Sequence, residues 1–164
     1  MTRRGTLHIA ALLAIGLGAL APATAQQAAP QAQQTYQDIE KSAGLVPEFM
    51  RQFPQVGIAG AWTEMRDIQF NPNTALPNKV KELIGLAVAA QVPCEYCIYA
   101  HTRAAKANGA SDAEIREAVA MAAITRHWST VLNGLQMDKD RFRREFDQIL
   151  SYAGEQAKAR QVSK

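Results

Sequence analysis

The residues best placed to do chemistry are two cysteines and a histidine in one short segment. Cys94 and Cys97 are the only cysteines of the chain, and they stand three positions apart in the run CEYC. His101 follows four positions after Cys97, and Glu82 lies twelve positions before Cys94. If Pro93 opens a helix, the thiols and the imidazole share one helix face, because positions three and four apart are neighbours. The spacing predicts a small redox or metal site.

The cysteine pair is spaced for reversible disulfide formation. On a helix, Cα atoms three positions apart are separated by about 5 Å, inside the roughly 4.4–6.8 Å that a disulfide requires. A helix N-terminus also favours the reactive thiolate, and on this ground alone Cys94 would be the nucleophile. His101, one turn beyond Cys97, can exchange a proton with it. A disulfide that closes so short a loop stabilises a fold weakly, so redox work explains the pair better than a structural role.

Other uses of this segment stay open as alternatives. Glu82, Cys94, Cys97 and His101 would supply four zinc ligands, but structural zinc sites usually draw their ligands from two separated clusters. We therefore expect redox chemistry, with no metal and no cofactor. A thiol–disulfide oxidoreductase, or a non-catalytic helical module with a fixed disulfide, is also compatible with the pair. Covalent haem is excluded, because Ile98 rather than histidine follows Cys97.

Glu82 has two interpretations of equal weight. It lies off the main apolar stripe of the helix predicted over residues 79–91, in a row with Gly85 and other small or apolar residues. Small neighbours would let another helix approach and shield the carboxylate from water, which suits a general base. The alternative is an exposed first-turn glutamate favoured by the helix dipole, with Lys79 and Lys81 nearby.

The elements that would position these residues are helices. Apolar residues recur at helical spacing over residues 79–91, and that helix is apolar on nearly every side. Such a helix is buried, either centrally or at a subunit interface. The next helix is predicted over residues 94–108, and Gly109 is suited to end it.

The remaining elements are also predicted to be helical. A short helix is expected over residues 36–42, and Pro54 implies a break further along. Ser111 and Glu114 form a capping box for an alanine-rich helix, and Asp138 can cap the last one. Strand alternation appears nowhere in the sequence, so we predict an all-α fold.

Glu82 and the run Cys94-x-x-Cys97-x-x-x-His101 together resemble the AhpD-like alkylhydroperoxidases of the carboxymuconolactone decarboxylase superfamily. The resemblance extends from about Gly44 to Glu114. It implies an AhpD-like helical bundle that assembles as a homo-oligomer, in trimers or multiples of them. It also implies thiol-dependent peroxidase activity, of the peroxiredoxin type, against hydroperoxides.

The resemblance implies a role for each site residue. Cys97 matches the peroxidatic cysteine and Cys94 the resolving one, while Glu82 and His101 match the proton-relay positions. Tyr96, which stands where another branch has a second histidine, enters only as a candidate pocket wall. The partners implied are a hydroperoxide and a thiol reductant that the sequence does not identify. The superfamily's other activity, decarboxylation of carboxymuconolactone, does not use the cysteine pair and is a less favoured alternative.

The first 25 residues have the pattern of a secretory signal peptide. Arg3 and Arg4 precede an uncharged apolar run over residues 7–20, and an A-x-A site ends at Ala25. The apolar run is shorter than the roughly 20 residues of a spanning helix. We therefore predict cleavage after Ala25 and export to the periplasm, with no membrane association afterwards.

The rest of the chain is predicted to hold a linker and one domain. Residues 26–34 (QQAAPQAQQ) are uncharged and of low complexity, which indicates a flexible linker. Residues 35–164 would form the AhpD-like domain. Two of the 18 basic residues fall in the signal. The other 16 (18 − 2) nearly balance the 15 acidic residues, so the rest of the chain has a net charge close to zero. The arginines after Asp138 alternate with acids, which is typical of a solvated helix face and gives no case for nucleic acid.

Overall fold

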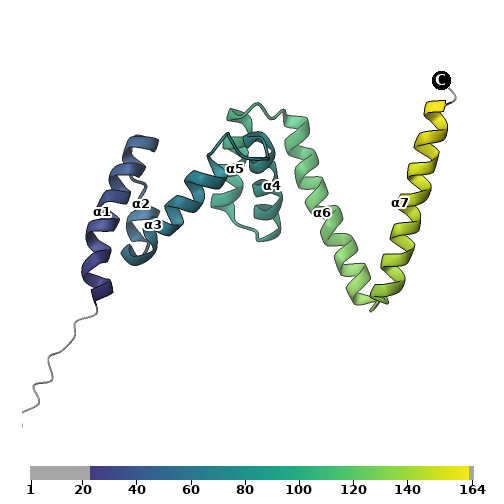
Figure 1. Ribbon diagram of the computed structural model, residues 1–164, viewed down its shortest axis with the longest axis horizontal. Helices are drawn as coiled ribbons and strands as arrows, with labels where there is room; N and C mark the ends of the chain where they lie inside the picture. The colour runs from purple at the N-terminus through teal and green to yellow at the C-terminus, as the bar shows by residue number, and fades with distance from the viewer. Residues whose placement is uncertain (1–22, 163–164) are drawn as a thin grey trace, which may run out of the picture. The chain divides into compact units, whose positions relative to one another are not determined.

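The computed structural model describes residues 23–162 of the chain (Figure 1). Within that range every regular element is helical and no strand occurs, which confirms the predicted all-α fold. In chain order the elements are α1 (Ala23–Ala43), α2 (Glu48–Gln52), α3 (Gln55–Glu64), the π-helix η1 (Met65–Gln69), α4 (Asn78–Gln91), α5 (Glu95–Ala107), α6 (Asp112–Gly134) and α7 (Lys139–Val162). They fall into two compact units, one ending at Arg66 and the other beginning at Asp67.

The first unit is built from α1, α2 and α3 around an apolar core. The chain turns after α1 at Gly44, whose φ of +80° lies in the left-handed region that favours glycine. Pro54 separates α2 from α3, as predicted from its inability to continue a helix. The buried core residues come from all three helices and the loop after α1: Ala32, Ile39, Val46, Met50, Ile58 and Trp62.

The interpretation of residues 26–34 as a flexible linker is wrong. They belong to α1, which runs on to Ala43 and so also replaces the short helix predicted over residues 36–42. Ala32 is 1% exposed in the core, and the hydroxyl of Thr35 donates to the carbonyl of Gln31. Alanine and glutamine are strong helix formers, so a low-complexity run of them is ordered once one face packs against α3. The predicted cut after Ala25 stays a prediction, and residues 1–22 of the predicted signal lie outside the described range.

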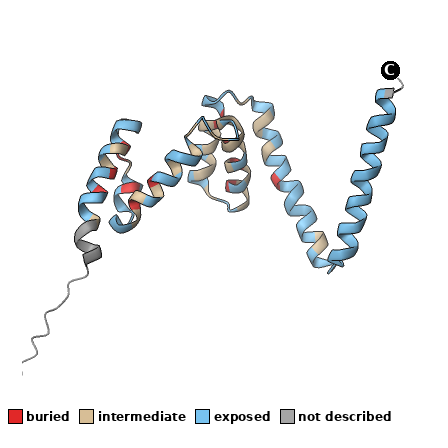
Figure 2. Cartoon of the chain, in the orientation of Figure 1, coloured by how far each residue is buried: buried red, intermediate tan, exposed pale blue. Residues whose placement is uncertain are grey.

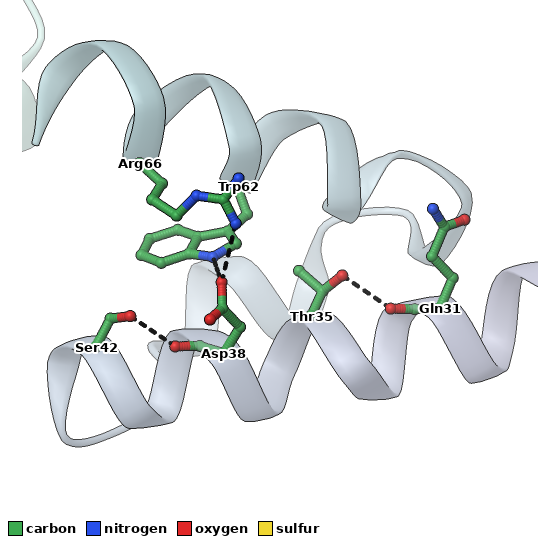
Figure 3. A network of polar contacts seen from close by, with 6 residues as sticks. All are labelled: Gln31, Thr35, Asp38, Ser42, Trp62 and Arg66. Carbon is green, nitrogen blue, oxygen red and sulfur yellow. Dashed lines mark hydrogen bonds and ion pairs between the residues drawn. The ribbon is translucent and has the colours of Figure 1, made fainter. Parts of the chain in front are cut away.

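A polar contact fixes α3 on α1 (Figure 3). The indole Nε1 of buried Trp62 donates to Oδ2 of Asp38 at 2.6 Å, and an Arg66 guanidinium nitrogen lies 3.3 Å from the same oxygen. The Trp62 hydrogen bond, helped by Arg66, holds the pKa of Asp38 below its usual value. We call these three residues the structural anchor. Asp38 satisfies the one polar side-chain atom of Trp62, and a buried donor is costly to leave without a partner.

In the second unit α4 packs against both α5 and α6. The ammonium of Lys79 on α4 lies 2.8 Å from the Glu114 carboxylate on α6, and the amide of Gln91 donates to the carbonyl of Ala122. These contacts attach both ends of α4 to α6. Two predicted boundary signals between α5 and α6 are confirmed, because Gly109 has a φ of +84° and Ser111 with Glu114 forms the capping box. Asp138 accepts from the Arg141 backbone N–H at 2.7 Å at the start of α7.

The last helix is exposed along its described length, as Figure 2 shows. Its large apolar side chains that are at least two-fifths exposed are Phe142, Phe146, Ile149, Leu150 and Tyr152. Among the described residues no helix is both long and apolar enough to cross a membrane. Helix α7 therefore presents an apolar stripe that no other described residue of its own unit covers.

Candidate redox site

Helix α5 begins at the cysteine pair. Cys94 is its N-cap residue, and its Sγ accepts the backbone N–H of Cys97 at 3.2 Å. The predicted helix start is therefore one position early, since Glu95 is the first helical residue. The two Cα atoms are 5.3 Å apart, and the sulfurs form a disulfide. Both side chains are half-buried, so the pair is accessible from outside the unit.

His101 connects the cysteine helix to α4. It lies four positions after Cys97, which places the two side chains on one face of α5. Its Nδ1 is 2.7 Å from Oε2 of Glu82, and its side chain is 23% exposed. An ionised carboxylate can only accept, so Nδ1 carries the hydrogen in that state and Nε2 is left to exchange a proton.

Glu82 has the buried environment of its first interpretation. Only 3% of its side chain is exposed. The two lysines in the first turn of the same helix have other partners: Lys79 pairs with Glu114, and Lys81 Nζ contacts the carbonyls of Ile68 and Asn71 at 2.7 Å. Lys79 and the Ser111 contacts lower the pKa of Glu114 to about 2. The Glu82 carboxylate instead contacts a ring nitrogen of His101 and the side-chain amide of Gln69.

Gly85 allows the close approach between α4 and the imidazole. A Cβ atom at this position would lie 2.5 Å from Cε1 and 2.6 Å from Nδ1 of His101. Such distances are far below van der Waals contact, so any side chain at position 85 must displace the ring. The small neighbour of Glu82 noted in the sequence therefore has a specific purpose, which is to let His101 reach the carboxylate.

Gln69 is a site residue that the sequence did not reveal. It is the last residue of the π-helix η1, and its Nε2 donates to Oε1 of Glu82 at 3.2 Å. No motif marks it, and it lies 13 positions before Glu82 in the sequence. Glu82, His101 and Gln69 form one hydrogen-bonded group, which we call the buried triad after its buried carboxylate; the other two side chains are partly exposed.

Tyr96 and the zinc alternative receive no structural support. The Tyr96 side chain is 89% exposed, so its place as a pocket wall stays a prediction. Across residues 23–162 no group of three or more histidine, cysteine, aspartate or glutamate side chains is arranged to hold a metal ion. The arrangement that the structure does bring together is a cysteine pair, an imidazole one turn away and a buried carboxylate.

Comparison with known proteins gives two matches. The sequence profile of the Carboxymuconolactone decarboxylase family matches residues 57–140, about half of the chain, which includes α4, α5 and α6. The crystal structure of the alkylhydroperoxidase AhpD core from Rhodospirillum rubrum is similar in fold, with a TM-score of 0.60 and 24% sequence identity. That alignment covers 71% of this chain and 89% of the other. A search of curated proteins found no match.

Proposed function

The chain belongs to the carboxymuconolactone decarboxylase family, and we propose that it is an exported thiol-dependent peroxidase that reduces hydroperoxides. The observation that carries the proposal is the 2.7 Å contact between His101 and buried Glu82, on the helix face that also holds Cys97. A general base beside a thiol promotes formation of the nucleophilic thiolate. The AhpD core with a similar fold is named as an alkylhydroperoxidase, which agrees with this chemistry.

The proposed reaction begins with the reduced cysteine pair. His101 accepts the proton of the Cys97 thiol, and the thiolate attacks the terminal oxygen of the hydroperoxide. The S–O bond forms as the O–O bond breaks, and the leaving alkoxide takes the proton from His101. Cys97 is thereby oxidised to a sulfenic acid and the peroxide is reduced to an alcohol. The Cys94 thiol then attacks the sulfenic sulfur, forms the disulfide and releases water.

The disulfide must be reduced before the next turnover. Two electrons and two protons come from a dithiol reductant, by thiol–disulfide exchange through a mixed disulfide. The half-buried position of both cysteines is compatible with attack by such a partner. If the chain is exported as we propose, this reductant is a periplasmic one. No metal or organic cofactor is needed for any of these steps.

We also propose that the protein assembles as a homo-oligomer, in trimers or multiples of them. An apolar groove of about 320 Å³ lies between α4 and α6, lined by Ile84, Val88, Val92 and Met121 among others. The apolar stripe of α7 is exposed as well. Soluble proteins rarely leave apolar surface of this extent uncovered, so contacts between copies are the simplest way to bury it. Light scattering tests this proposal, and a monomer would contradict it.

A stopped-flow assay tests the peroxidase proposal. The purified protein is reduced, freed of reductant and mixed with hydrogen peroxide or organic hydroperoxides. We expect one equivalent of peroxide to be consumed as the disulfide forms. Cys97→Ser should abolish this reaction, whereas the matched variant Cys94→Ser should still react once and leave a trappable sulfenic acid. Unchanged peroxide consumption by Cys97→Ser would show that the nucleophile is assigned wrongly.

The same two variants separate the alternative functions. A thiol–disulfide oxidoreductase would exchange with disulfide substrates but would not consume peroxide. A decarboxylase acting on carboxymuconolactone would keep its activity in both cysteine variants, because that reaction does not require thiols. A fixed structural disulfide would resist mild reductants altogether.

A further inference from the structure

The proposed reaction makes no use of Gln69, although this residue contacts the buried carboxylate directly. Its amide Nε2 donates to Oε1 of Glu82, while the other oxygen, Oε2, is the one that meets His101. The two oxygens of a single carboxylate are therefore held by different partners. Rotation of the carboxylate would break both contacts at once, so the amide and the imidazole together define its orientation.

We propose that Gln69 is a positioning residue, which fixes Glu82 so that its Oε2 is presented to His101. This inference rests on the proposed function for its catalytic meaning. Gln69 need not touch the peroxide or the thiols. It acts through Glu82, and Glu82 acts through the imidazole that exchanges the proton of Cys97.

The chemical nature of the partner supports this role. A buried carboxylate requires hydrogen-bond donors, because an unsatisfied buried polar group costs free energy. A lysine or arginine in place of Gln69 would satisfy Glu82 but would also cancel its charge. The neutral amide supplies a donor and leaves the negative charge available. That charge then stabilises the imidazolium that forms when His101 accepts the thiol proton.

The segment that carries Gln69 is itself held in place from α4. Lys81 Nζ contacts the carbonyls of Ile68 and Asn71, on either side of Gln69, and lies 3.1 Å from Oδ1 of Asn78. The end of η1 is thus tied to the first turn of the helix that bears Glu82. π-Helical turns often occur at functional sites. Here the π-helix and the lysine together position an amide that no regular pattern in the sequence predicts.

The test compares Gln69→Met with the native chain. Methionine keeps the unbranched shape of glutamine but donates no hydrogen bond. We expect the ¹⁵N NMR signals of the His101 ring to move, because they report the tautomer and the hydrogen bond at Nδ1. The signals of His127, which lies outside the buried triad, should stay in place and serve as the internal reference. In the reduced protein, the rate at which iodoacetamide alkylates Cys97 should fall about tenfold, the usual worth of one hydrogen bond to a charged group.

A matched control is available in the same chain. The amide of Gln52 donates to Oε1 of Glu48 at 3.1 Å, on the exposed surface of α2. Gln52→Met removes the same kind of contact and should change neither the His101 signals nor the alkylation rate. The variant Gln69→Asn keeps the amide but shortens its reach by one carbon, so its effects should be smaller than those of Gln69→Met.

The outcomes separate this proposal from the proposed function. If folded Gln69→Met leaves the His101 signals unmoved and the alkylation rate within twofold of the native chain, the positioning role is wrong. If Gln69→Met does not fold, Gln69→Asn decides by the same two measurements. Lack of peroxide consumption by the native chain would contradict the peroxidase proposal alone, because the NMR comparison needs no peroxide.

Discussion

The structural anchor of the first unit and the buried triad of the second contain contacts of nearly the same length, although the anchor donors share one carboxylate oxygen and the triad donors meet two. In each, a carboxylate meets a ring nitrogen at short distance, 2.6 Å for Trp62 on Asp38 and 2.7 Å for His101 on Glu82. In each, a second nitrogen follows at 3.3 Å from Arg66 or 3.2 Å from Gln69. The length of a hydrogen bond alone therefore does not distinguish a structural contact from a chemical one.

The difference lies in what the partners can do. An indole N–H donates and never accepts, and a guanidinium cancels the charge of Asp38, so the anchor has one stable protonation state. An imidazole exchanges protons near neutral pH, and the amide of Gln69 leaves the charge of Glu82 in place. Burial differs as well, since the Asp38 side chain is 39% exposed and that of Glu82 is 3% exposed. The imidazole of His101 and the neutral amide of Gln69 make the buried triad suitable for proton transfer.

Removing the charge from each carboxylate should have the largest effects, on the reaction rate for Glu82 and on stability for Asp38. Glu82→Gln is expected to slow the reaction of reduced Cys97 with peroxide by about 10²–10⁴-fold, the usual contribution of a positioned acid–base group. Asp38→Asn should leave that rate unchanged and instead lower the stability of the first unit. Stopped-flow rates and thermal unfolding measure the two effects. Rates within twofold of the native chain for Glu82→Gln would contradict the relay.

A methyl group at position 85 should separate the imidazole from its carboxylate. In Gly85→Ala the new Cβ must displace the His101 ring, so we expect the Cys97 reaction rate to fall about 10–100-fold, part of the contribution of a positioned base. Gly60→Ala on α3 is the matched control, because a Cβ there meets nothing within 4 Å. That substitution should stabilise the helix by about 0.5–1 kcal/mol and leave the rate unchanged. Equal rates for both variants would mean that the ring is not held as described.

Replacing the indole ring of the structural anchor should change the stability of the first unit and leave the peroxide reaction unaffected. Trp62→Phe removes the indole donor from Asp38 and leaves space in the core, so we expect the first unit to lose about 1–3 kcal/mol. Chemical denaturation followed by circular dichroism measures this loss. The peroxide reaction of Cys97 should keep its native rate, and a large loss of rate in a folded variant would mean that the two groups are coupled.

The smallest effect concerns acid stability at the contact between α4 and α6. The pKa of Glu114 is lowered from 4.5 to about 2 by Lys79 and the Ser111 contacts. A lowered pKa in the folded state contributes stability above pH 4.5, and this contribution is lost as the pH falls towards 2. Denaturant midpoints should therefore differ between the native chain and Glu114→Gln at pH 6, and the difference should shrink in that window. A difference independent of pH would contradict this account.

Local signals in the sequence predicted most of the helical framework. Gly109, the Ser111–Glu114 box and Asp138 act within a few residues of themselves, so their spacing alone locates the helix ends. The linker interpretation failed because the order of residues 26–34 depends on packing of α1 against α3, which composition does not report. The role of Gln69 could not be predicted for a similar reason. Its partner is brought near by a π-helix and by Lys81, and neither leaves a periodic pattern.

Apart from Gln69, the sequence predicted which residues form the candidate site, but not how their side chains are arranged in space. The spacing from Cys94 to His101 places three groups on one helix face by geometry alone. The burial of Glu82 could not be decided from α4 by itself, because the same glutamate would be exposed if α5 lay elsewhere. Only the close approach over Gly85 settles that question, and such an approach is a property of two helices together.

The N-cap position of Cys94 has a consequence for how the site is dissected by mutagenesis. Its sulfur accepts a backbone N–H of α5, so the residue is a helix terminus as well as a thiol. Serine is a favoured N-cap residue and would keep an acceptor there, whereas alanine would remove the thiol and the cap together, at a cost of about 0.5–2 kcal/mol. A defect seen in Cys94→Ala would therefore combine loss of the thiol with fraying of the α5 N-terminus. Cys94→Ser removes the thiol but keeps the cap, so its defect reports the role of the sulfur alone.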